Sequence, residues 1–363
     1  MVWSVSGLNA GLVIRVRFVE SGPSTDLFPV VMATGIVSIA ADAHRYWRLG
    51  IALGILALVG FAGLAARFAI GAITHRTQTA VLARDPDVAL RMFSFVAACT
   101  VLGACWDDHP AAVWLLGGLA LGAWLILTPL AAFNVTSRKS TDLRDRARGG
   151  WLLPSVATAG LAITAANLAQ QARAPELVVI AVVAWIMAIV GYLAVVWLIG
   201  WRALASPFGP DQVTPDSWIL MGALAITTLA GDHIVAAARA VNPPAGIAHW
   251  TAPLTLAAWV LASSWIPALL YSQIWRINQQ AGSLRYQHAW WAAVFPLGMY
   301  SAASAATAVE LHLRSLQTVS LVFFWIAFTT WTLVTTGWLN TVSWHRATSC
   351  RGSRGVPGRE GAR

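Results

Sequence analysis

Apolar residues fill most of this chain in runs that are separated by short polar segments. A membrane-spanning helix needs about 20 predominantly apolar residues. Ten runs of roughly this length are predicted to span a membrane, at 27–42, 47–73, 88–106, 110–133, 151–169, 176–200, 217–238, 247–271, 289–309 and 317–343. The pattern therefore predicts an all-α integral membrane protein, with an N-terminal segment at 1–26, a transmembrane domain at 27–343 and a basic, disordered tail at 344–363.

The connections between the runs alternate between short and long. Only a few residues follow each odd-numbered run, and short connections join antiparallel neighbours, so the chain is predicted to form five helical hairpins. Most arginines lie in the longer connections and in the two terminal segments. Because basic residues are retained on the cytoplasmic side, this bias predicts a multi-pass protein of the cell membrane with both termini in the cytoplasm.

Odd-numbered and even-numbered runs differ in side-chain size. Bulky apolar residues fill the even-numbered runs, whereas the odd-numbered runs are rich in Ala, Gly, Ser and Thr. Three odd-numbered runs share a large apolar residue before proline and two small residues after it: Phe28-Pro29 with Thr34-Gly35, Leu153-Pro154 with Ala159-Gly160, and Phe295-Pro296 with Ser301-Ala302. Small and hydroxyl residues suit helix contact or a water-filled lumen. The repeat favours a quasi-fivefold bundle whose inner, odd-numbered helices surround a central path; tight packing without a path is the alternative.

Composition excludes several classes of protein. With 58% hydrophobic and only 11% charged residues, the chain does not match a soluble globular domain. The net charge is +9, and the basic residues lie mostly in connections and terminal segments next to the spans, where they set the orientation of the chain in the membrane. No nucleic-acid partner is therefore predicted. Cys99, Cys105 and Cys350 lack the spacing of a metal or redox pair, and no nucleotide-binding loop is present. No catalytic residue, cofactor or metal is predicted, and membrane lipid is the expected surrounding partner.

Three motifs carry a family resemblance: Phe28-Pro29-Val30-Val31-Met32-Ala33-Thr34-Gly35-Ile36-Val37-Ser38, Trp151-Leu152-Leu153-Pro154, and Trp290-Trp291-Ala292-Ala293-Val294-Phe295-Pro296-Leu297-Gly298. They resemble the tellurite-resistance/dicarboxylate transporter family, which includes fungal malate permeases and plant slow anion channels. The resemblance spans about residues 27 to 343 and implies a homotrimer, small anionic substrates, and Phe295 as the gate of the pore. Ala33 departs from the glycine that many relatives carry there.

The predicted path is polar without being charged, because a fixed cation in the lumen would hold an anion too tightly. The pore-lining residues are predicted to be Thr34, Gly35, Ser38, Pro154, Thr158, Thr227, Thr228, Pro296 and Ser301. Their hydroxyls can donate hydrogen bonds to an anion, although each could instead bond to its own helix. For Phe295 the alternative to a gate is an aromatic ring packed beside a proline.

Two ionisable residues in the seventh span, Asp232 and His233, are candidates for proton coupling, since charged groups within a membrane are costly and often functional. A paired or hydrated Asp232 near the external mouth is the simpler interpretation, and a membrane-embedded enzyme using both residues is a further alternative. Asp107-Asp108-His109 occupies a short turn and is interpreted as turn chemistry, because consecutive residues rarely converge on one metal ion.

The sequence hypothesis is therefore a transporter, not an enzyme. It moves small anions, C4-dicarboxylates such as malate in particular, either as a channel or as a proton-linked carrier. The alternatives are a channel or exporter for inorganic anions such as sulfite, chloride and nitrate, or a tellurite-resistance protein.

Overall fold

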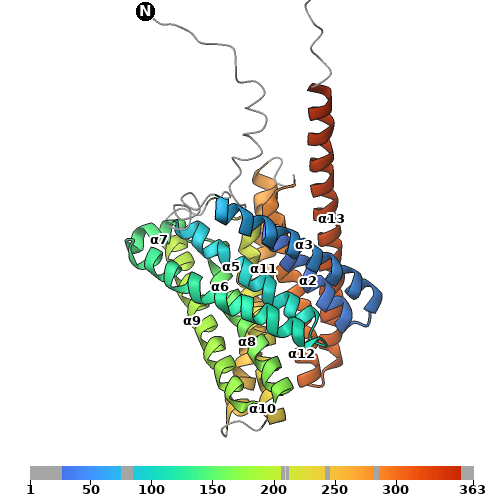
Figure 1. Ribbon diagram of the computed structural model, residues 1–363. Helices are drawn as coiled ribbons and strands as arrows, with labels where there is room; N and C mark the ends of the chain where they lie inside the picture. Colours follow the sequence, from blue (N-terminus) through green and yellow to red (C-terminus); the bar gives the residue numbers. More distant parts are fainter. Residues whose placement is uncertain are drawn as a thin grey trace, which may run out of the picture.

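The described part of the chain is a bundle of helices (Figure 1). The computed structural model describes residues 27–74, 85–205, 209, 212–241, 246–280 and 286–352; the predicted segment 1–26 and the last residues of the predicted tail, 353–363, lie outside them. Five helices correspond to the odd-numbered runs: α2 (Phe28–Ala43), α5 (Pro86–Cys105), α8 (Leu153–Ala172), α10 (Ile219–Val241) and α12 (Trp291–Glu310). Five correspond to the even-numbered runs: α3 (Trp47–Thr74), α6 (Pro110–Thr136), α9 (Pro175–Ala205), α11 (Ile247–Gln279) and α13 (Arg314–Gly352). The predicted all-α membrane protein is confirmed.

Helix contacts arrange the first set as a closed ring. α2 packs against α5, α5 against α8, α8 against α10, α10 against α12, and α12 returns to α2. Each of these helices also packs extensively against the helix that follows it in the chain, so α2 pairs with α3, α5 with α6, α8 with α9, α10 with α11 and α12 with α13. We call α2, α5, α8, α10 and α12 the inner helices and their five partners the outer helices.

Burial separates the two sets. In the most apolar stretches of α5, α8, α10 and α12, between 67% and 83% of residues are buried, against 22% to 33% in the five outer helices. Nine helices of the described chain are long and apolar enough to cross a membrane, and α2, with 16 residues, is a shorter apolar helix. Its residues are mostly buried within the ring, and the outer faces of its longer neighbours remain exposed as lipid-facing surface.

Glycines on the inner helices allow these helices to approach each other closely. A Cβ added to Gly35 of α2 would lie 2.7 Å from Val101 of α5, and one added to Gly160 of α8 would lie 2.2 Å from Thr100 of α5. Real Cβ atoms do not tolerate such distances, so the glycines fit because they have no side chain.

Each outer helix also contacts the inner helix of the next pair. Four of these contacts are hydrogen bonds from an indole Nε1: Trp124 of α6 to Thr158 Oγ1 of α8 at 2.9 Å, Trp185 of α9 to the Thr227 carbonyl of α10 at 2.8 Å, Trp259 of α11 to Ser304 Oγ of α12 at 3.1 Å, and Trp331 of α13 to Thr34 Oγ1 of α2 at 3.0 Å. The fifth contact, between α3 and α5, stacks the rings of Phe61 and Phe95 with centroids 5.5 Å apart. Neighbouring pairs are therefore joined all the way around the ring.

Several helices have a proline in their first turn, and short helical segments lie in the longer connections. Pro29, Pro86, Pro110 and Pro154 lie in the first turns of α2, α5, α6 and α8, where a missing N–H costs no helix bond. The short helix α7 (Ser140–Arg146) and the 3-10 turns η2 (Gly149–Leu152), η4 (Pro215–Trp218) and η5 (His288–Trp290) fill parts of the longer connections.

The last helix is longer than its sequence pattern predicts. α13 has 39 residues and ends at Gly352, beyond the predicted boundary at 343 and within the segment for which the sequence predicts disorder. At about 1.5 Å per residue it is roughly 58 Å long, about twice the hydrocarbon thickness of a bilayer. Figure 1 shows its end extending past the other helices.

Candidate functional site

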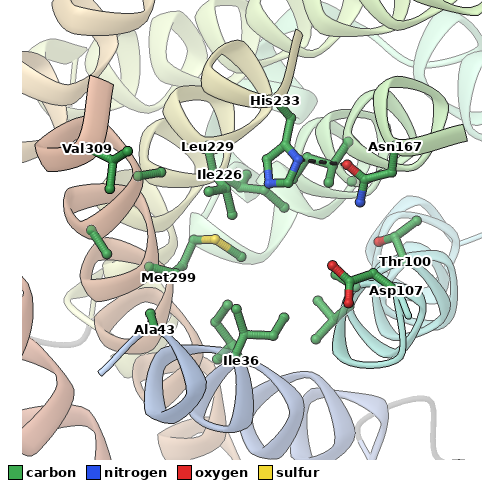
Figure 2. A pocket seen from close by; sticks show the side chains of 18 of the residues that line it. Ile36, Ala43, Thr100, Asp107, Asn167, Ile226, Leu229, His233, Met299 and Val309 are labelled. Carbon is green, nitrogen blue, oxygen red and sulfur yellow. Dashed lines mark hydrogen bonds between the residues drawn. The ribbon is translucent and has the colours of Figure 1, made fainter. Parts of the chain in front are cut away.

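Two cavities lie at opposite ends of the inner ring. The N-side cavity, of about 310 Å³, lies at the N-terminal ends of the inner helices, and its lining includes Met32, Ser94, Leu153, Ile219 and Phe295, one residue from each inner helix. The C-side cavity, of about 670 Å³, lies toward the C-terminal ends and is also lined from all five inner helices, including by Ile36, Thr100, Asn167, Ile226 and Met299 (Figure 2). The ring therefore has a hollow at each end.

A thin apolar layer separates the cavities. Met32 and Phe295 line the N-side cavity, whereas Ile36 and Met299, one helical turn further along α2 and α12, line the C-side cavity. Four residues of helix correspond to about 6 Å. We call these four side chains the septum; none of them is more than 2% exposed. The septum is a layer of bulky apolar groups from α2 and α12 between the two cavities.

Phe295 lies where α12 is interrupted by proline. Pro296 has no N–H to donate to the Ala292 carbonyl, and Ala292 itself lines the N-side cavity. The Pro296 ring packs against α10, since a Cβ added to Gly222 would lie 2.8 Å from two of its carbons. Phe295 thus lies beside a proline inside α12, in a segment that packs against the neighbouring inner helix α10.

Phe28 and Leu153, which precede proline in α2 and at the start of α8 as Phe295 does in α12, have surroundings that differ from each other. Phe28 packs against the rings of Phe61, Phe68 and Phe95, with centroids 5.3 to 6.3 Å away, so it belongs to an aromatic cluster between α2, α3 and α5. Leu153, by contrast, lines the N-side cavity as Phe295 does. The shared position before proline therefore does not give a shared role.

The residues predicted to line the pore line neither of these two cavities. All of them belong to the described chain, and neither cavity is lined by Thr34, Gly35, Ser38, Pro154, Thr158, Thr227, Thr228, Pro296 or Ser301. Several of their hydroxyls bond toward outer helices. Ser38 donates to the Gly50 carbonyl of α3 at 2.7 Å and Ser301 donates to the Ser320 carbonyl of α13 at 2.7 Å.

The threonine hydroxyls of this set donate to carbonyls of their own helices, which is the alternative to pore lining that the sequence leaves open. Thr34 donates to the Val30 carbonyl at 2.8 Å, and Thr158 to the Pro154 carbonyl at 2.7 Å, while both hydroxyls accept an indole N–H from an outer helix. Thr227 and Thr228 likewise donate to carbonyls one turn earlier in α10, at 2.7 and 2.9 Å. The hydroxyls of Thr34 and Thr158 therefore join inner to outer helices, whereas those of Thr227 and Thr228 bond within α10.

The polar groups of the C-side cavity come from other positions. Asn167 of α8 and His233 of α10 form a hydrogen bond of 2.7 Å between Oδ1 and Nδ1, drawn in Figure 2 at the wall of the cavity. Thr100 lines the same cavity, with its hydroxyl donating to the Ala97 carbonyl at 3.0 Å. Asn167 was not predicted, although a polar side chain in an apolar span is a signal that could have identified it.

Asp232 and His233, neighbours in sequence, have different partners. Asp232 accepts a hydrogen bond of 3.1 Å from Thr307 of α12 and does not line the C-side cavity, whereas His233 does. The two side chains therefore do not act as one pair in this structure.

Turn residues complete the mouth of the C-side cavity. His44, Arg45 and Asp107 lie in the turns after α2 and α5 and line this cavity. Burial, and secondarily the charge of Asp108, raises the pKa of Asp107 above its ordinary value. Burial lowers the pKa of His44, whose Nε2 lies 2.9 Å from Ser320 Oγ. Asp108 and His109 continue the exposed turn toward α6.

The N-side cavity carries positive charge. Its lining includes Arg91 of α5 and Arg148, together with the carboxylate of Asp216. That carboxylate accepts the Gly150 N–H at 3.0 Å and the Thr214 hydroxyl. The N-terminal entrance therefore has two guanidinium groups and one carboxylate that is engaged by neighbouring donors.

A ring of inner helices with a cavity at each end and a closed apolar centre is the architecture of a membrane transport protein. The chain also matches the family model described as SLAC1, voltage-dependent anion channel, over residues 24–339. It belongs to this family, the tellurite-resistance/dicarboxylate transporter family of the sequence resemblance, and is accordingly a multi-pass membrane protein of an anion channel and transporter family.

Three relatives are described as membrane proteins or as a transporter. The chain is 36% identical to an uncharacterized membrane protein of Mycobacterium tuberculosis strain CDC 1551 over 143 residues, which are 39% of this chain and 72% of the relative. An uncharacterized membrane protein of strain H37Rv gives the same values. An uncharacterized transporter of Methanocaldococcus jannaschii is 23% identical over 251 residues, covering 66% of this chain and 69% of the relative.

Proposed function

We propose that this protein moves small anions, C4-dicarboxylates such as malate in particular, across the cell membrane along the axis of the inner ring, with Phe295 as the gate. The observation that carries the proposal is the septum: all five inner helices line a cavity on each side of it, and along α2 and α12 only about one helical turn separates the two cavities. Apolar constrictions of this kind close a pore by excluding water.

Phe295 is the septum residue best placed to move. Its ring borders the N-side cavity, which offers space on one side, while Ile36 is in contact with α12, where a Cβ on Gly298 would lie 2.9 Å from Ile36 Cγ2. Rotation of the Phe295 ring into the N-side cavity would thin the septum without separating the helices. Pro296 supports the proposal because it weakens the helix at that turn.

The charge distribution supports entry of anions from the N-side. Arg91 and Arg148 line that cavity together with one carboxylate, Asp216, so positive charge is in excess there and raises the local concentration of anions. We infer that this side faces the cytoplasm, because most arginines of the sequence lie on it. The homotrimer implied by the family resemblance is part of the proposal, and native mass spectrometry in detergent counts the chains.

Anion flux from proteoliposomes tests the gate. Phe295→Ala is expected to raise flux about tenfold or more, because it removes the largest septum side chain. Phe28→Ala is the matched control: it deletes the equivalent ring before a proline, but from the aromatic cluster, so flux per folded protein stays at the parent level. Equal flux from Phe295→Ala and the parent would remove Phe295 from the gate role.

The same vesicles identify the substrate class. Malate, succinate, sulfite, chloride and nitrate are offered in turn, each against a fixed potential. Faster flux of malate and succinate than of the three inorganic anions is expected. Preference for chloride or nitrate would instead assign the protein to inorganic anions and leave the gate result standing.

A further inference from the structure

Away from the polar turn residues at its mouth, the C-side cavity has a polar cluster of two residues in a wall that is largely apolar. Asn167 and His233 meet there from α8 and α10, and around them lie apolar residues that include Ile163, Ile226 and Leu229. In Figure 2 the amide nitrogen of Asn167 and the second ring nitrogen of His233 both face the cavity. An apolar pocket with a few convergent polar groups is the usual form of a small-molecule site.

The hydrogen bond between the two residues sets their donors. Asn167 Oδ1 is an acceptor only, so His233 Nδ1 carries the hydrogen of the 2.7 Å bond. The neutral ring then presents Nε2 to the cavity as an acceptor, and the protonated ring presents Nε2–H as a donor beside the amide N–H of Asn167. Protonation therefore converts the cluster from a mixed donor and acceptor into a set of donors with a positive charge.

We propose that Asn167 and His233 form a binding subsite for a carboxylate group, occupied together with one proton. A carboxylate has two acceptor oxygens, and the cluster offers two neighbouring donors when His233 is protonated. The proton goes to His233 Nε2 and the anion binds against it, so each ligand raises the affinity for the other by the same factor. This inference rests on the proposed transport of anions. It assigns carboxylates as the substrate class and couples their binding to the binding of one proton.

The other ionisable groups near this end of the ring lie at the mouth of the cavity or have partners outside it. His44, Arg45 and Asp107 line the cavity from the turns at its mouth. Asp232 is bonded to Thr307, and Glu310 forms an ion pair with Arg239 in which Nη1 and Oε2 are 2.8 Å apart. Among the described residues that line the C-side cavity, His233 is the titratable group that lies within an inner helix.

Equilibrium binding to the purified full-length protein tests the subsite without requiring transport. Calorimetric titrations with succinate and with chloride are made at about pH 5.5 and about pH 8, on either side of the ordinary histidine range. For the parent, succinate is expected to bind about tenfold more tightly at the lower pH, the effect of one charge-assisted hydrogen bond. Chloride, a single acceptor, is expected to change by less than about threefold.

Two variants assign the effect to the cluster. His233→Gln keeps a polar side chain but cannot gain a proton, so the pH dependence of succinate binding is expected to disappear. Asn167→Leu is expected to weaken succinate binding about threefold to tenfold at both pH values through loss of a neutral donor. His44→Gln and Asp107→Asn are controls from the same cavity and are expected to retain the succinate pH dependence.

Retention of the full pH dependence by His233→Gln overturns the inference, as does its loss in His44→Gln or Asp107→Asn. Equal succinate affinity of the parent at both pH values overturns it as well. Failure of Phe295→Ala to change flux leaves these titrations unaffected, so the gate and the subsite can fail separately.

Discussion

Inner and outer helices are both apolar, yet they are built for different neighbours. The outer helices place Leu, Ile, Val and Trp on exposed faces, whereas the inner helices are buried and rich in alanine, glycine, serine and threonine. Side-chain size, more than hydrophobicity, distinguishes them, because an inner helix must pack against two inner neighbours and at least one outer helix. The comparison teaches that hydroxyls on an inner helix can serve the scaffold rather than the lumen.

Deleting a buried tryptophan should have the largest effect on stability. Trp185 and Trp197 lie on the same outer helix, but Trp185 is fully buried against α10 and Trp197 is 73% exposed. Trp185→Ala is expected to lower the free energy of unfolding by about 3 to 5 kcal/mol, through a cavity and a lost hydrogen bond. Trp197→Ala should change it by less than about 1 kcal/mol. Thermal unfolding in one detergent compares them, and similar losses would contradict the distinction between inward and lipid-facing positions.

Adding one methyl group to an inner glycine should have the next largest effect. Gly160→Ala places a Cβ against Thr100, so it is expected to cost about 1 to 3 kcal/mol. Gly122 of α6 has nothing within 4 Å of its added Cβ, and Gly122→Ala is expected to be neutral or to stabilise by up to about 1 kcal/mol. The two melting temperatures should therefore move in opposite directions or differ clearly. A gain in stability for Gly160→Ala would show that the inner contact is looser than described.

Removing one indole hydrogen bond between an outer and an inner helix should have a smaller effect. Trp124→Phe keeps a ring but removes the N–H that Thr158 accepts, for an expected loss of about 1 kcal/mol. Thr158→Val and the double variant complete a thermodynamic cycle, in which a coupling of about 0.5 to 1.5 kcal/mol is expected. Strict additivity of the two single losses would show that the bond does not stabilise the junction.

The turns that join inner to outer helices belong to neither set, and the smallest effect is expected there. Because burial raises the pKa of Asp107, this carboxyl takes up its proton at a higher pH than an ordinary aspartate. Lowering the pH then removes a negative charge from the C-side mouth, so anion entry from that side should rise by less than about threefold. Asp107→Asn should already show the higher rate at neutral pH and lose this component. A lower rate of anion entry in Asp107→Asn would contradict the expectation that the carboxylate of Asp107 slows anion entry.

Helix positions could be predicted from the sequence because length and hydropathy determine them. The ten predicted spans correspond to the ten helices, and the major discrepancy is the extension of α13 to Gly352, where apolar length no longer marks the end of a helix. Composition also distinguished inner from outer helices. Both features depend on sums over many residues, which tolerate errors at single positions.

The rotation of each inner helix about its own axis could not be predicted. Thr34 and Ile36 are two residues apart on α2, yet Thr34 bonds to α13 and Ile36 lines the C-side cavity. Asp232 and His233 are adjacent but face different partners. On a helix that is apolar or small all round, periodicity does not indicate which face points to the axis. For the same reason the sequence favoured hydroxyls for the lumen, while the cavities are lined largely by apolar residues.

The hydrogen bond from Trp331 to Thr34 joins the last helix of the bundle to the first. With it, the contacts between neighbouring helix pairs form a closed ring. One contact in a closed ring cannot widen unless the other contacts also shift. The proposed gate, Phe295, is a side chain that takes no part in these contacts between neighbouring helix pairs. Rotation of a single aromatic ring disturbs few contacts, whereas separation of the five helix pairs would disturb every contact between neighbouring pairs. If Phe295 is the gate, as we propose, the scaffold stays stiff while the pore opens, and the free energy of opening is separate from the free energy of folding.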